Sequence, residues 1–165
     1  MMQHEITRAR PLLDANGNIA EPGFARKLLP AYSRKAVKAG ALRLKEWDYY
    51  LVNNGRWAVA LTVADNGYMG LDSISFIDLE NLWQNTLSPI SALPMGRRRM
   101  PESFARGDVE VKGRSYSIFF RHVPGGRVLS FAMSGFSGNL PIQGEILLTH
   151  APEESIVMCT PFLKQ

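Results

Sequence analysis

The chain has 165 residues, of which 45% are hydrophobic and 21% are charged, and its formal net charge is +4. These values are typical of one globular domain and disfavour a disordered chain or a coiled coil. Cys159 is the single cysteine and cannot form an intrachain disulfide. Because no signal peptide precedes it, we expect a reducing, cytoplasmic location. No window approaches the ~20 apolar residues of a membrane span, so none is expected.

Residues 1–41 are predicted to wrap the surface and to contain a short helix. Between residues 11 and 23, proline, glycine and asparagine are frequent, which is typical of turns. From Phe24 to Ala39 the apolar side chains recur every four residues, which predicts a helix. Pro30 should divide this helix into two pieces, and Gly40 is a suitable stop.

Residues 42–165 predict one antiparallel β domain, because short alternating segments are separated by turn residues. We expect strands at 42–52, 56–65, 70–78, 108–112, 114–122, 127–134, 143–150 and 155–160. Eight strands suffice to close an up-and-down barrel around side chains or one small ligand. The predicted fold class is therefore all-β: an antiparallel meander barrel, or an open half-barrel, with a short helical N-terminal segment.

Several strands carry large side chains on one face and small ones on the other. The strands at 56–65 and 127–134 show this most clearly. Small residues permit a cavity or a close contact between sheets, and we expect one of these beside their small faces. The small positions are Ala58, Ala60, Thr62, Ser130, Ala132 and Ser134.

Residues 80–107 show no clear periodicity and predict a long loop, functional or mobile. Arg97, Arg98 and Arg99 lie in this loop. Such a run is either solvated charge or a clamp for a phosphate or carboxylate, and both interpretations stay open. Nucleic-acid binding is not expected, because the basic residues form two separate clusters and the net charge is modest.

Residues with catalytic chemistry are few. The three histidines are isolated in the sequence, so neither a metal site nor a cofactor is expected. Asp48, Asp65 and Asp72 are the candidates for an acid–base pair. Capping of turns and solvation of strand ends are the simpler explanation of such aspartates.

Three stretches are distinctive: KEWDYY at 45–50, ADNGYMGLDS at 64–73 and PMGRRRMP at 94–101. With their flanking segments they resemble the N-terminal half of the DUF2804 family, a bacterial family of unknown function, over essentially the whole chain. The resemblance implies a relation to the lipocalin-like double barrels of hydroxyneurosporene synthase and AttH-type proteins. It also implies a longer protein with a second half, so a truncated copy, a single-barrel variant and an excised domain are all open. No catalytic residue comes from the family.

Three functions follow as hypotheses, and whether the chain is an enzyme stays open. The first is a binding module for a small apolar or amphipathic ligand. Its wall candidates are Trp47, Tyr49, Trp57, Tyr68, Met69, Phe131 and Met133, with Arg97 and Arg98 in a lid or anion clamp. The second is a cofactor-independent enzyme acting on a lipid-like or isoprenoid substrate through Asp48, Asp65 or Asp72. The third is a structural half that pairs, through free strand edges, with a second copy or a second barrel.

Overall fold

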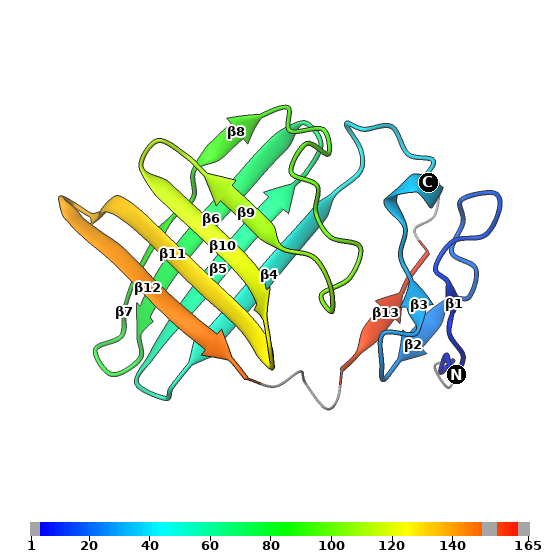
Figure 1. Ribbon diagram of the computed structural model, residues 1–165, viewed down its shortest axis with the longest axis horizontal. Coiled ribbons are helices and arrows are strands. Elements are labelled where there is room, and N and C mark those ends of the chain that lie inside the picture. The colour runs from blue at the N-terminus through cyan, green and yellow to red at the C-terminus, as the bar shows by residue number, and fades with distance from the viewer. Residues whose placement is uncertain (1–3, 150–154, 162–165) are drawn as a thin grey trace.

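The computed structural model describes residues 4–149 and 155–161, which form an almost entirely β structure (Figure 1). Two antiparallel sheets lie face to face, and two small two-stranded sheets lie beside them. The predicted all-β class is therefore confirmed. In the described ranges, no helix has the length and apolar character needed to cross a membrane.

In the first sheet, the first four strands form a meander in which each strand pairs with the next along the chain. Its short turns follow from residues such as Gly55, whose φ of +88° suits glycine. A short strand, β8, pairs with the start of β6. The strands are β4 (Glu46–Asn53), β5 (Trp57–Asp65), β6 (Met69–Asp78), β7 (Trp83–Leu87) and β8 (Ile90–Ala92).

The second sheet is also a meander and lies over the first, with its strands crossing those of the first at a steep angle in Figure 1. Alternate apolar side chains from the two sheets meet between them and form the main core. Leu61 and Ile74 enter from the first sheet, and Phe120 and Leu129 from the second. The strands are β9 (Val109–Lys112), β10 (Tyr116–Val123), β11 (Gly126–Ser137) and β12 (Leu140–Leu148).

The strand pairing corrects three predictions. Among the described residues, no hydrogen-bonded pairing joins the two sheets into a closed barrel. The predicted loop at 80–107 contains β7 and β8, which were missed because β8 has three residues and β7 has no alternating pattern. The last predicted strand exists as β13 (Val157–Cys159), but it pairs with an N-terminal strand rather than with the meander. Residue 150, the predicted end of strand 143–150, lies outside the described residues.

The helix predicted at 24–39 is wrong. This segment holds β3 (Pro30–Ala31), most of β2 (Gly23–Ala25) and a single 3-10 turn at Arg34–Ala36. The main chain of Phe24 is already used in extended pairing, donating to His4 and accepting from Ile6 at 3.0 and 2.7 Å. Pairing with distant segments thus overrides the local four-residue spacing.

The small sheets bring the two ends of the described chain together (Figure 1). β1 (Arg10–Pro11) runs parallel to β3, and β13 pairs antiparallel with β2. A separate small core forms around Ile6, Ala25 and Cys159. We call residues 4–31 and 155–161 the terminal unit.

Candidate functional site

The strand register gathers four carboxylates on the inner face of the first sheet, at one end. Glu46 is opposite Asp65, while Asp48 and Asp72 flank Val63 from either side. Positions two apart along a strand share a face, so all four acids face the second sheet. The three predicted aspartates therefore do come together, and the sequence reasoning missed Glu46.

Asp72, like Asp65, is only 1% exposed, and both of its carboxylate oxygens are paired. The Arg98 guanidinium donates to both carboxylate oxygens and also to Ser91, while the Tyr116 hydroxyl donates to Asp72 at 2.6 Å. Burial, followed by this hydrogen bond to a carboxylate, raises the pKa of Tyr116 to about 12. Arg98 is therefore neither solvated charge nor a free anion clamp.

Asp65 binds the backbone of two neighbouring segments through its carboxylate. It accepts hydrogen bonds from the backbone N–H groups of Gly67 at 3.0 Å and Gly96 at 2.7 Å. Gly96 belongs to residues 93–101, which we call the covering loop because they close over this end of the first sheet. The turn-capping interpretation thus describes Asp65 well.

Asp48 is the carboxylate with an unused oxygen. Its Oδ2 is buried and has no hydrogen-bond partner among the described residues. Burial raises the pKa of Asp48, an effect that the nearby Arg127 charge opposes in part. Arg127 itself donates to the Tyr50 hydroxyl and to the carbonyl of Gly107. A buried acceptor without a donor is costly, and such groups often mark a site that another molecule completes.

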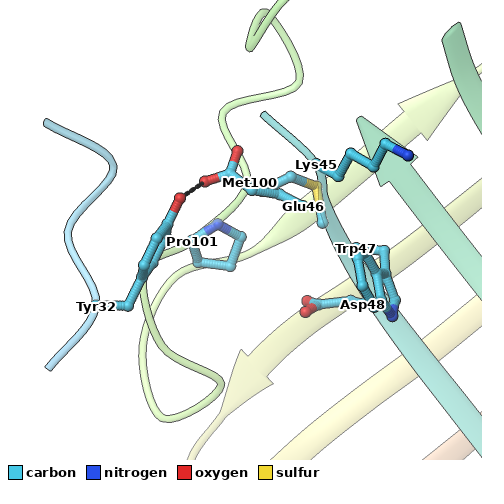
Figure 2. Close-up of a pocket in the computed structure, with 7 residues that line it drawn as sticks. All are labelled: Tyr32, Lys45, Glu46, Trp47, Asp48, Met100 and Pro101. Atoms are coloured by element: carbon cyan, nitrogen blue, oxygen red, sulfur yellow. Dashed lines mark hydrogen bonds between the residues drawn. The ribbon is translucent and has the colours of Figure 1, made fainter. Parts of the chain in front are cut away.

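A pocket of about 260 Å³ opens beside Asp48 (Figure 2). In Figure 2 the Asp48 carboxylate points from β4 into this space. The Tyr32 hydroxyl donates to Glu46, which also forms an ion pair with Arg34. The pocket is lined by Tyr32, Lys45, Glu46, Trp47, Asp48, Met100 and Pro101. It therefore combines one unpaired carboxylate with the apolar surfaces of Trp47, Met100 and Pro101.

Of the predicted site residues, only Trp47 and Asp48 line this pocket. Tyr49 is exposed on the outward side of β4, and Tyr68 is exposed in the turn before Met69. Trp57 stacks on Phe76, away from the four carboxylates.

The remaining predicted site residues also lie elsewhere. Phe131 and Met133 are packed in the core, and Arg97 is exposed and donates to the carbonyls of Leu93 and Pro94. A signal for the pocket was present in the sequence, because Glu46 and Asp48 stand two apart in an alternating strand. Tyr32, Met100 and Pro101 come from distant segments, which no local pattern connects.

No group of three or more histidine, cysteine or acidic side chains in the described ranges is placed to hold a metal ion. In a comparison with known protein families, residues 3–165 match the family described as "Domain of unknown function (DUF2804)". No curated protein and no solved structure matches the chain.

Proposed function

The chain belongs to the DUF2804 family, whose function is unknown, and from the pocket beside β4 we propose that it binds a small amphipathic molecule. The lipocalin-like relationship suggested by the sequence belongs to this proposal, since proteins of that kind hold small ligands between strands. The site here lies at one end of the two sheets rather than in the packed space between them.

One observation carries the proposal: the buried, unpaired Oδ2 of Asp48 in a pocket with apolar walls. The neighbouring carboxylates are already occupied, Glu46 by Arg34 and Tyr32 and Asp72 by Arg98 and Tyr116. Asp48 is thus free to accept a hydrogen bond from a ligand. Ligand sites typically pair a mostly apolar wall with a few such oriented polar groups.

The ligand that fits carries a hydrogen-bond donor on an apolar body. A protonated amine or a hydroxyl would satisfy Asp48, and an alkyl or ring portion would lie on Trp47 and Met100. A carboxylate head group fits poorly, because it would approach Asp48 and Glu46 with charge of the same sign.

Calorimetric titration with octylamine, octanol and octanoate tests this choice, since the three probes differ only in their head group. We expect the amine to bind most tightly and the carboxylate least. Asp48→Asn should weaken amine binding by roughly tenfold or more, as expected for a lost hydrogen bond to a charged group. Glu110→Gln is the matched control, because Glu110 is exposed on the second sheet. Failure of all three probes to bind, or equal effects of the two variants, would contradict the proposal.

Acid–base catalysis by Asp48 is the second candidate function, supported by the raised pKa of this carboxyl. A cofactor-independent reaction on a lipid-like substrate would use Asp48 as the proton acceptor or donor. Native mass spectrometry of the purified protein separates the two functions. A co-purified molecule that keeps its mass during incubation supports binding, and conversion to a new mass that Asp48→Asn abolishes supports catalysis.

A further inference from the structure

The outward face of the first sheet has no charged side chain. The pairing register assigns outward positions on β4 to β8, and none of them is Asp, Glu, Lys or Arg. On the second sheet, the outward positions include Glu110, Lys112, Arg121 and Glu145. Lys112 and Arg121 both pair with Glu110 there. The second sheet thus has the face of a solvated sheet, and the first does not.

Four hydroxyl groups beside β6 on the uncharged face are paired with one another. The Thr86 hydroxyl donates to Ser75 at 2.8 Å, and the Ser88 hydroxyl donates to Ser73 at 3.0 Å. Covering these hydroxyls would therefore cost little, because they need no hydrogen bond from water.

On the same face, bulky side chains lie along one edge and small side chains lie beside them. On β4, Trp47, Tyr49 and Leu51 project outward and are 62%, 55% and 52% exposed. Next to them, β5 presents only alanines and one threonine, and the centre of β6 presents serines. Three bulky exposed side chains along one edge strand are an apolar surface of the kind that marks an interaction site.

We propose that a second copy of this chain packs on the outward face of the first sheet. A two-fold axis parallel to the strands would place β4 of each copy over β6 and β7 of the other. The bulky β4 side chains of each copy would then pack against the small outward side chains of the other copy, and the two-fold axis would repeat this contact. Since neither face is charged, no unpaired charge is buried, as in the apolar interfaces of homodimers.

The size of the face indicates how strong this association is. Four strands about 4.8 Å apart and about eight residues long cover roughly 500 Å² of sheet. Two such faces give about 1,000 Å², which is near the lower limit of specific interfaces. The expected dimer is therefore weak, and its population depends on protein concentration.

Analytical ultracentrifugation over a wide concentration range tests the proposal with two matched variants. Leu51 on β4 and Leu147 on β12 are both outward-facing leucines on edge strands, 52% and 58% exposed. Leu51→Glu buries an unpaired charge in the proposed dimer, so we expect roughly tenfold or more weaker association. Leu147→Glu should leave association unchanged.

Tyr49→Lys repeats the test on the same strand if Leu51→Glu fails to fold. A concentration-independent monomer would overturn the proposal. So would a dimer that the β4 variants leave intact, since strands joined edge to edge through β4 would leave this face in water. Equal weakening by Leu147→Glu would also overturn it.

Discussion

At the residue scale, Asp72 and Arg98 form the most consequential contact in the described chain. The Asp72 side chain is 1% exposed and the Arg98 side chain 11%, and the two are hydrogen-bonded to each other and to Tyr116 and Ser91. Removing one partner of a buried ion pair leaves an uncompensated charge, which costs far more than the pair itself contributes.

We predict that Arg98→Met lowers the free energy of unfolding by about 3–5 kcal/mol, because Asp72 loses its cation. Arg99→Met is the control, since Arg99 is the exposed neighbour of Arg98 and should change stability by less than about 0.5 kcal/mol. Urea denaturation of the two variants provides the comparison. Equal losses of stability would mean that the pair is solvated.

Asp48 predicts a pH dependence. Burial raises its pKa above the ordinary 3.8, so the folded chain holds this proton more tightly than the unfolded chain. The resulting contribution to stability is present at low pH and is lost as the pH rises through the raised pKa. Asp48→Asn avoids this loss, so its stability relative to the wild type should increase from acid to neutral pH. Denaturation curves at several pH values measure this difference, and a difference that does not vary with pH would refute it.

At the element scale, the covering loop holds backbone strain. Leu93, Met95 and Arg99 have φ of +49°, +49° and +51°, in a region that residues other than glycine seldom adopt. Contacts fix this conformation: Leu93 and Met95 donate backbone hydrogen bonds to Tyr68 and Gly67 at 3.0 Å each. The loop that completes the pocket is thus held in place by the first sheet.

Strain at Met95 predicts an unusual preference for glycine. Met95→Gly should be more stable than Met95→Ala by about 1 kcal/mol, because alanine keeps the unfavourable positive φ. At Arg97, which has no positive φ, the order should reverse, since glycine there only adds freedom to the unfolded chain. Thermal unfolding of the four variants tests both orders, and the same order at both positions would exclude strain.

The sequence predicted those elements whose pattern is local. Alternation and turn residues located all eight strands that were expected, with ends that differ by a few residues. β7 lacked a signal because its polar residues Gln84 and Thr86 flank Asn85 without alternation. The pocket could be predicted only in part, since Trp47 and Asp48 share a strand, whereas Tyr32, Met100 and Pro101 approach it through tertiary packing.

At the scale of the whole molecule, the described chain has two cores of unequal size. The main core joins side chains from both large sheets, while the core of the terminal unit contains three buried residues, Ile6, Ala25 and Cys159. A small core supported by short strands opens at a lower free energy than a large one. We therefore expect the terminal unit to open before the two large sheets separate.

The tryptophans and the cysteine lie in different parts of the molecule, so they report separately on the unfolding of each part. Trp47, Trp57 and Trp83 all lie in the first sheet, and Cys159, the one cysteine of the sequence, lies buried in the terminal unit. Burial also raises the pKa of the Cys159 thiol, which slows its reaction with disulfide reagents. With increasing denaturant, labelling of Cys159 should accelerate while tryptophan fluorescence is still native. Coincident transitions would show that both cores unfold as one cooperative unit.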